Sequence, residues 1–469
     1  MDYLTKIQKD LKNNDDLIIK KIIVNNQEIF LLSIDTLVNS TNINDFILRK
    51  LTYLQKEKNL FEYLYNNLPC NNIIKCQNYD ETINLLLNGF TLLLINNQVL
   101  GIETIQNLSR GINTAEYEKS VMGPKDSFNE FFNTNIGLIR KRIKSPFLKL
   151  ETLNIGRYTN TKIGLMYIEN ISKKGLKEKL LEKLQRIDLD GIIDSSYLKK
   201  YLSKSHSLFP TIRETERPDL TSQALLEGKI IIIVDNSPNV LILPSFFIDF
   251  FHTSDDYYQK HLNITFIRIV RLLAFLISLL LPCYYVAITT YNVDFIPINL
   301  LINFVSQRTR VPLPAFMEAF IMILSFEILR ESDMRIPSSQ GTAISILGGL
   351  VLGDAAVSAG IISPIMIIVI AISAISSLVF SSIEIVNAIR YWRFILLILA
   401  SLFGLYGIFL GIILIIINLS DTQSMDKDYL YPFAPINLKG QKDGFIKNPH
   451  SFLYRNPLLS NNHLRGKIK

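Results

Sequence analysis

The residues whose spacing could carry chemistry lie in a stretch of small and apolar residues, 341–362. A glycine or serine recurs at every fourth position, which on a helix gives a flat stripe for close contact with a neighbouring helix. This stripe consists of Gly341, Ser345, Gly349 and Gly353. The opposite face carries Ile344, Leu347, Val351 and Asp354. In a symmetric oligomer, apolar rings beside a ring of carboxylates are suited to an ion gate that closes by dewetting and has a charged mouth.

A second interpretation of the same stretch is a packed helix whose Asp354 is bonded by a neighbouring residue. The residues alone leave the two interpretations open. The rest of the chain shows no HExxH, GxSxG, Walker or dinucleotide motif in a fitting context, and its five histidines are scattered. The three cysteines form no CxxC motif and, with the histidines, no zinc spacing. The sequence therefore predicts no enzyme, no metal site and no cofactor.

The elements that must position the gate follow from a sharp division in composition. Residues 1–262 are rich in Lys, Asn, Asp and Glu, residues 263–420 are dominated by apolar and small residues, and 421–469 form a polar, basic tail. This predicts an α+β soluble half followed by an α-helical multi-pass membrane domain of about four to six spans. The net charge of +7 is spread widely and includes no dense arginine tract, so nucleic acid is not an expected partner.

The soluble half shows an internal similarity. Residues 87–97 and 226–236 each combine a helix end, a glycine, an apolar strand and a polar turn. We predict two similar α/β subdomains, 1–120 and 145–262, although such a helix-to-strand join is also common by chance. Apolar spacing over 43–66 predicts one helix in the first of them.

A helix over 128–144 is predicted between the subdomains, within the connecting segment 121–144. Ser127 is its expected N-cap, and three basic residues lie near its C-terminal end. Bridging the subdomains is the simpler role for this helix, and an anion site is the alternative.

In the membrane half, spans are predicted over 269–290, 364–380 and 394–419, with a kink at Pro282 and a polar connector over 384–393. The basic tail and the basic residues of the connector both indicate the cytosol, which a single span over 394–419 does not permit, and the sequence leaves this conflict open. Residues 297–335 are ambiguous because prolines and charges interrupt them. Helical spacing favours a pair within this segment, Glu327 with Arg330 or Glu331 with Arg335. The basic residues Lys260, Arg268 and Arg271 at the start of the first span, and no apolar leader after Met1, predict a cytosolic N-terminal half.

Several blocks of the chain together resemble the A subunit of GerA-type spore germination receptors. The blocks include GPKDSFNEFFNTNIGLIRKRI (123–143), ERPDLTSQALLEGKIIIIVD (216–235), FFHTSDDYY (250–258) and GGLVLGDAAVSAGIISP (348–364). The residues taken as the family motif are Glu216, Arg217, Pro218, Asp219, Glu227 and Gly228.

This resemblance implies a multi-pass protein of the spore inner membrane, in contact with membrane lipid. It implies a transporter-like B subunit that binds the nutrient, a lipoprotein C subunit, and a homo-oligomer of A subunits that forms a nutrient-gated ion channel. The stretch 341–362 then becomes the pore candidate. The alternative is an accessory subunit of the same family, encoded with dipicolinate-release genes, that modulates germination or acts as a scaffold without binding a nutrient. A solute transporter is less consistent, since transporters usually have about ten or more spans built as repeats.

Overall fold

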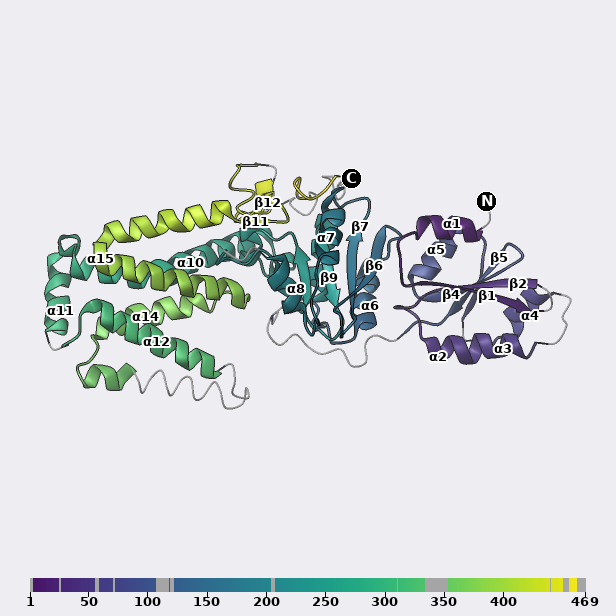
Figure 1. Cartoon of the computed structure of the whole chain (residues 1–469), viewed down its shortest axis with the longest axis horizontal. Helices are drawn as coiled ribbons and strands as arrows, with labels where there is room; N and C mark the ends of the chain where they lie inside the picture. The colour runs from purple at the N-terminus through teal and green to yellow at the C-terminus, as the bar shows by residue number, and fades with distance from the viewer. Residues whose placement is uncertain are drawn as a thin grey trace.

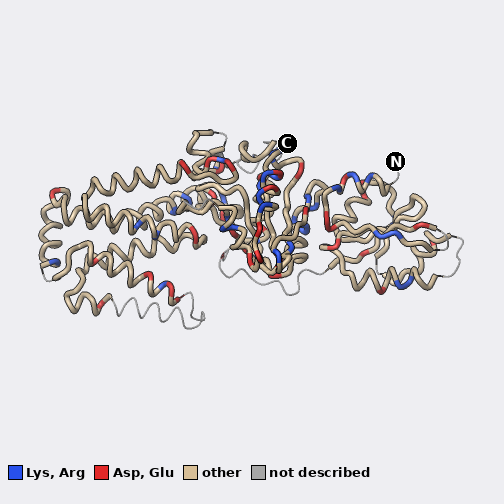
Figure 2. The backbone as a smooth tube through the Cα atoms, viewed as in Figure 1, with Lys and Arg blue, Asp and Glu red and all other residues tan. Residues whose placement is uncertain are grey.

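The computed structural model describes residues 3–24, 27–54, 59–70, 72–106, 118, 122–203, 207–309, 311–333, 353–438, 440–449 and 455–461. Two sheet-containing domains and a bundle of long helices follow one another in a row, with the bundle at one end and the N-terminal domain at the other (Figure 1). Charged residues are dense in the two sheet domains and sparse along the bundle (Figure 2). The sheet domains and the helix bundle therefore correspond to the charged and apolar halves expected from composition.

The first domain is built on a five-stranded antiparallel sheet in the order β1-β2-β4-β5-β3. One face packs on α1 and α5, and the other on the helical segments between β2 and β3. The elements are α1 (Tyr3–Asp10), β1 (Leu17–Val24), β2 (Gln27–Ile34), α2 (Ser40–Asn42), a π-helix (Ile43–Leu48), α3 (Arg49–Thr52), α4 (Leu60–Asn67), β3 (Ile73–Cys76), α5 (Tyr79–Leu87), β4 (Phe90–Ile95) and β5 (Gln98–Glu103).

The second domain has a sheet of the same strand order, β6-β7-β9-β10-β8, again antiparallel throughout. Alternate side chains of its strands point to opposite faces, where α6 and α9 cover one side and α7 and α8 the other. The elements are α6 (Phe132–Arg142), β6 (Leu148–Ile155), β7 (Thr161–Ile168), α7 (Leu176–Gln185), α8 (Ser195–Leu202), β8 (Arg213–Thr215), α9 (Pro218–Glu227), β9 (Ile230–Val234) and β10 (Val240–Leu243).

The two segments that suggested an internal similarity occupy equivalent places in the two sheets. Gly89 follows α5 and precedes β4, and Gly228 ends α9 before β9. Both glycines have left-handed backbones, with φ of +88° and +96°. A residue with a Cβ is strained in this conformation, so glycine permits the helix to stop and the central strand to begin at once.

Two helix predictions in this half were wrong in their bounds. The stretch 43–66 is not one helix, because α4 starts anew at Leu60, where the Asn59 side chain accepts the amide of Glu62. The helix predicted from 128 begins at Phe132, and Ser127 is not its cap. The Phe128 amide instead donates to the carbonyl of Glu216 at 2.8 Å, which holds this segment extended beside the start of α9.

The two sheet domains are joined by a buried contact. Arg140 of α6 donates to both carboxylate oxygens of Asp16 at 2.6 and 2.7 Å, and both side chains are buried. Next to this pair, the Asp15 amide donates to the Leu150 carbonyl at the edge strand β6. The helix α6 thus belongs to the core of the second domain and also binds the first.

Among the residues that the structure describes, five helices of eleven or more residues form the bundle. They are α10 (His261–Thr290), α11 (Ile298–Arg308), α12 (Ala315–Asp333), α14 (Pro364–Ser377) and α15 (Ile383–Asp421). Within the described ranges, α10 and α15 are the two segments long and apolar enough to cross a membrane, and α15 divides its length between two arms. The segment α11 lies across the end of the bundle that is far from the sheet domains (Figure 1).

The last predicted span, 394–419, was wrong, because α15 is a helical hairpin. Its backbone leaves the helical region at Gly404, with φ 61° and ψ −137°. A Cβ added at Gly411 would lie 2.2 Å from the Leu396 side chain, although residues 15 apart in one straight helix are about 22 Å apart. The two arms therefore run back along each other, and α15 begins and ends at the bundle end next to the second domain (Figure 1).

Candidate functional site

The predicted motif residues gather at the junction between the second domain and the bundle. Arg217 is 1% exposed and makes two hydrogen bonds to the Asp219 carboxylate, at 3.1 and 2.8 Å. It also donates to the backbone carbonyls of Glu118 and Pro124, at 3.2 and 2.9 Å. Pro218 is the first residue of α9, where a proline costs no hydrogen bond. Arg217 therefore fastens the start of α9 to the segment that leads into α6.

Tyr258, from the block 250–258, completes this arrangement. Its hydroxyl donates to Asp219 at 2.7 Å, so the short segment before α10 is bound to the same carboxylate. The Arg217 guanidinium and the Tyr258 hydroxyl hold the pKa of Asp219 below its usual value, against the effect of its burial. Asp219 thus stays ionised and keeps both partners.

The other end of the motif contacts the C-terminal tail. A Cβ added to Gly228 would lie 2.9 Å from the backbone oxygen of Leu459, so only glycine allows the tail to approach this closely. The next residue, Lys229, is buried and pairs with Asp249 at 2.7 Å and with Glu227 at 3.9 Å. The motif residues lie along one path from the tail, through α9, to the entry of α10.

Asp256 is the centre of the junction, and it was not singled out from the sequence. It is 2% exposed and accepts from Arg268 at 3.0 Å and from Arg271 at 2.9 Å, both on α10. Arg271 also binds the Phe251 carbonyl and the Thr253 hydroxyl. One buried carboxylate therefore ties the loop of the second domain to the first long helix.

The tail joins the same centre. Arg268 donates to the Asp443 carboxylate at 2.8 Å and to the Gly444 carbonyl at 2.5 Å. Both arginines were used from the sequence as charges that mark the start of a span, but they are buried and paired, and α10 begins earlier, at His261. Their position therefore reflects the junction as well as any membrane boundary.

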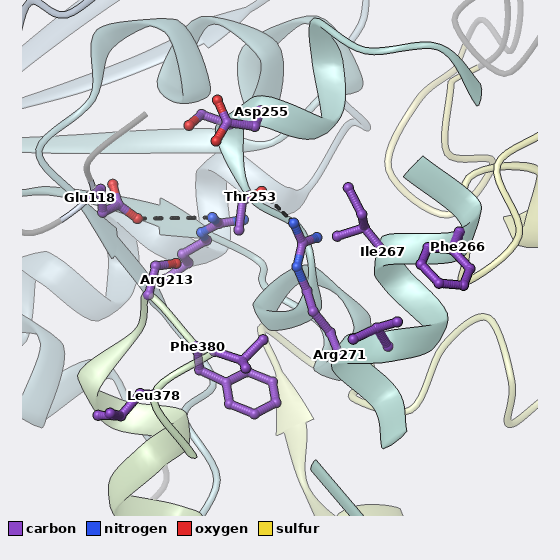
Figure 3. Close-up of a pocket in the computed structure, with 13 residues that line it drawn as sticks. Glu118, Arg213, Thr253, Asp255, Phe266, Ile267, Arg271, Leu378 and Phe380 are labelled. Atoms are coloured by element: carbon purple, nitrogen blue, oxygen red, sulfur yellow. Dashed lines mark hydrogen bonds and ion pairs between the residues drawn. The ribbon is translucent and has the colours of Figure 1, made fainter. Parts of the chain in front are cut away.

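A cleft of about 530 Å³ opens beside these contacts (Figure 3). Arg213 and Arg271 reach into it from the second domain and from α10, and apolar residues such as Phe266 and Phe380 line its other side. Arg213 donates to the carbonyls of Asp249 and His252 and lies 4.0 Å from the Glu118 carboxylate. The cleft is thus polar on the domain side, and α10 contributes both a charged residue, Arg271, and apolar residues to its other side.

Burial sets the charge of the groups around the cleft. It raises the pKa of Glu118, while the nearby Arg213 and the Thr215 hydroxyl act in the opposite direction. Burial, together with Arg268 and Arg213, lowers the pKa of His252 well below its ordinary value. His252 is therefore a neutral side chain at physiological pH and no source of a pH response near 7.

A second contact ties the domain to the hairpin. Lys199 of α8 pairs with Glu214 of β8 at 2.5 Å and also with Glu384 in the first turn of α15. The far arm of the hairpin returns to the same domain, where the Thr422 hydroxyl donates to Ser207 at 2.9 Å. Both ends of α15 are therefore held by the second domain.

Inside the bundle, charged residues pair between helices. Glu327 of α12 binds Arg390 and Arg393 of α15, each at 2.8 Å. Glu327 therefore binds across to α15 and not to Arg330 as expected, and Arg335, the expected partner of Glu331, lies outside the described residues. The polar residues 384–393, predicted as a connector, are the first part of α15 itself. Glu318 of α12 is fully buried beside Arg308 of α11, at 3.7 Å.

Most of the predicted pore stretch lies outside the described residues, including Gly341, Ile344, Ser345, Leu347, Gly349 and Val351. Residues 353–358 are helical, with Gly353 buried and Asp354 exposed. A Cβ at Gly353 would touch the Ile367 side chain of α14 at an ordinary distance of 3.9 Å. The pore assignment and the close-packing stripe remain predictions.

Comparison with known proteins places this geometry in a family. The sequence profile of the Bacillus/Clostridium GerA spore germination proteins matches residues 5–459. Spore germination protein KA of Bacillus subtilis is 36% identical over 95% of this chain and 84% of its own length. Spore germination protein GerQA of Bacillus cereus is 34% identical over 99% of this chain and 94% of its own length.

A solved structure also matches. It is the N-terminal domain of the A subunit of the Bacillus megaterium spore germinant receptor GerK3, at 29% identity, with 52% of this chain and 94% of that chain covered and a TM-score of 0.38. Since the family profile spans nearly the whole chain and relatives above 30% identity cover it, the protein belongs to the GerA family of spore germination proteins.

Proposed function

We propose that this chain is the A subunit of a nutrient germinant receptor and that its helix bundle assembles with further copies into a nutrient-gated ion channel of the spore inner membrane. The observation that carries this proposal is the position of charged residues inside an apolar bundle. Glu318, Glu327 and Arg393 are buried or nearly buried between helices. Charges at membrane depth are costly and usually line or control an ion pathway.

The junction supplies a route from the soluble half to the pore. The domain contacts α10 through Asp256 and α15 through Lys199, and α15 contacts α12 through Glu327. The helix α12 leads directly into 334–362. A movement of the second domain is thereby passed to the candidate gate through paired charges rather than through a flexible linker.

The hairpin in α15 also supports a consistent topology. From the sequence, the basic tail and the basic residues before 394 both indicated the cytosol, which a single span between them does not permit. Because the chain reverses at Gly404, the start and end of α15 lie at the same end of the bundle as the second domain. We place the sheet domains and the tail in the cytosol.

The partners follow from the same assignment. A transporter-like B subunit would bind the nutrient, and a lipoprotein C subunit would complete the receptor. Copies of the A subunit would form the ring, in which Ile344, Leu347 and Val351 close the pore and Asp354 lies at its mouth.

Spores carrying Leu347→Ala or Val351→Ala in this chain test the proposal in its native setting. A smaller side chain at the constriction should allow water to fill the closed pore, so that such spores lose cations and germinate without nutrient. Ile398→Ala, on an exposed face of α15, is the matched control and should leave dormancy intact. Normal dormancy in both gate variants, with the receptor present at its usual level, would refute the pore assignment.

A further inference from the structure

The helix α11 is held against the end of the bundle by one of its faces. Phe304 packs against Tyr285 of α10, with the ring centroids 6.0 Å apart. Arg308, one turn later on the same face, donates to the Thr289 carbonyl of α10 at 3.5 Å and lies 3.7 Å from the buried Glu318 carboxylate of α12. This face of α11 therefore points toward the bundle.

The rest of α11 is exposed and divides into two stripes of different chemistry. One stripe is apolar and each of its residues is more than half exposed: Ile298, Ile302 and Val305. The other stripe is polar and exposed: Asn299, Asn303 and Ser306. With 3.6 residues per turn, the apolar stripe lies on the flank of the helix, and the polar stripe lies roughly opposite the face that contacts the bundle.

The position of α11 matches the far boundary of a membrane. The chain carries no charged residue between Arg271 and Asp294. Tyr291, which ends α10, lies about 30 Å from Arg271 along the helix, and the hydrocarbon core of a bilayer is about 30 Å thick. Since α11 follows this end and lies across it (Figure 1), it lies where hydrocarbon gives way to headgroups.

Exposed aromatic side chains mark the same level of the bundle. Tyr291 and Phe295 precede α11, Tyr406 lies at the tip of the α15 hairpin, and all three are more than half exposed. The tip is held beside the end of α10, because the Asn292 side chain accepts the Leu405 amide at 3.2 Å. Phe295 and Tyr406 also line a groove of about 720 Å³ whose other lining residues are apolar apart from Asn292. Exposed tyrosines are typical of the membrane–water interface.

We propose that α11 is an interfacial helix that binds lipid in the leaflet far from the sheet domains. Because α11 lies across the axis of the bundle, its flank points along the membrane plane and its polar stripe points away from the membrane. The apolar stripe enters the boundary between headgroups and acyl chains, where such helices lie about 5–10 Å deep. This inference rests on the membrane position of the bundle in the proposed function, and not on ion conduction.

The contact with lipid is hydrophobic in nature. Within α11, Arg308 is the one charged residue, and it faces the bundle. The helix therefore offers no cation to an anionic headgroup on its exposed stripes. Vesicles of phosphatidylcholine alone should hold α11 as well as vesicles that also contain phosphatidylglycerol.

The experiment attaches a nitroxide label to single cysteines in the full chain, after its three native cysteines have been replaced, and reconstitutes each protein in both kinds of vesicle. Collisions of the label with oxygen report lipid, and collisions with a water-soluble nickel complex report water. Labels at Ile302→Cys and Val305→Cys should collide with oxygen more and with nickel severalfold less than labels at Asn303→Cys and Ser306→Cys. All four positions are exposed, so labelling there leaves the packing of the bundle intact.

Two reference labels separate the possible failures. Tyr158→Cys, on the surface of the second domain, reports water, and Leu276→Cys, on an exposed face of α10, reports hydrocarbon. Equal nickel collisions at Ile302 and Asn303, with Leu276 still in lipid, would overturn the proposal for α11 alone. Protection of Ile302 and Val305 from both reagents would overturn it as well, because a second copy or another protein would then cover the stripe. A lipid signal that required phosphatidylglycerol would refute the hydrophobic contact. Nickel collisions at Leu276 equal to those at Tyr158 would refute the membrane position of the bundle and the proposed function with it.

Discussion

The junction at Asp256 makes a quantitative prediction. Asp256→Asn keeps the shape of the side chain but removes the charge that two buried arginines share. Arg268 retains Asp443 as a partner, whereas Arg271 is left with the Phe251 carbonyl and a hydroxyl. Breaking a buried ion pair by removing one partner typically costs about 3–5 kcal/mol. We expect a loss at the lower end of that range, about 3 kcal/mol, because Arg268 remains paired.

The assay is thermal or denaturant unfolding of the purified chain in detergent, with limited proteolysis near 250–260 to locate the weakened region. Asp255→Asn is the matched control, since Asp255 is adjacent, is only half-buried and accepts the Met122 amide at 3.1 Å. Its substitution should change stability by less than about 1 kcal/mol. Equal stability of Asp256→Asn and Asp255→Asn would show that the arginines do not depend on Asp256, and the account of the junction would fail.

Three further substitutions test separate parts of the structure. Arg140→Ala should destabilise the chain by about 3 kcal/mol or more, because it removes the buried ion-pair partner of Asp16 between the sheet domains. Limited proteolysis should then cleave more readily between the two domains. Unchanged resistance to proteolysis would contradict the interface. Gly404→Ala should cost about 1–3 kcal/mol, from a positive φ that disfavours alanine, with thermal melting in detergent as the measurement and Ser401→Ala as control; an unchanged melt would argue against the hairpin. Glu118→Gln should make the free energy of unfolding less dependent on pH. Burial raises the pKa of Glu118 above its ordinary 4.5. The contribution of Glu118 to stability is therefore fully present below pH 4.5 and is lost as pH rises through the pKa of the folded state. Identical pH profiles for Glu118→Gln and wild type would refute that burial cost.

The elements that follow from local sequence were predictable, whereas long-range contacts were not. A run of five buried aliphatic residues after Gly228 predicts the central strand β9, because a glycine stop and an apolar run are both local signals. The pairing of Glu327 with Arg390 joins residues 63 positions apart, so helical spacing alone favoured the nearer Arg330. Only the packing of α12 against α15 determines the partner.

The hairpin shows why the membrane half was harder to predict. Residues 394–419 are apolar without a polar break, and composition alone gives one long span. The turn depends on the backbone of Gly404 and on glycines 407 and 411, which let the two arms touch. Glycines in an apolar stretch equally indicate packing within one straight helix. The role of Asp256 could not be predicted either, because it depends on contacts with two arginines that in the sequence look like ordinary charges flanking a span.

The central claim is that the bundle forms a gated pore around 341–362. Its most direct test is monovalent cation conductance of the purified, oligomeric chain in planar bilayers, for wild type and Val351→Ala. The account predicts little or no conductance for the wild type without its partners and a clear, cation-selective increase for Val351→Ala. The contrary result is that neither protein conducts, even when each is folded and oligomeric and the B and C subunits are supplied together with nutrient. That result would contradict the gated pore.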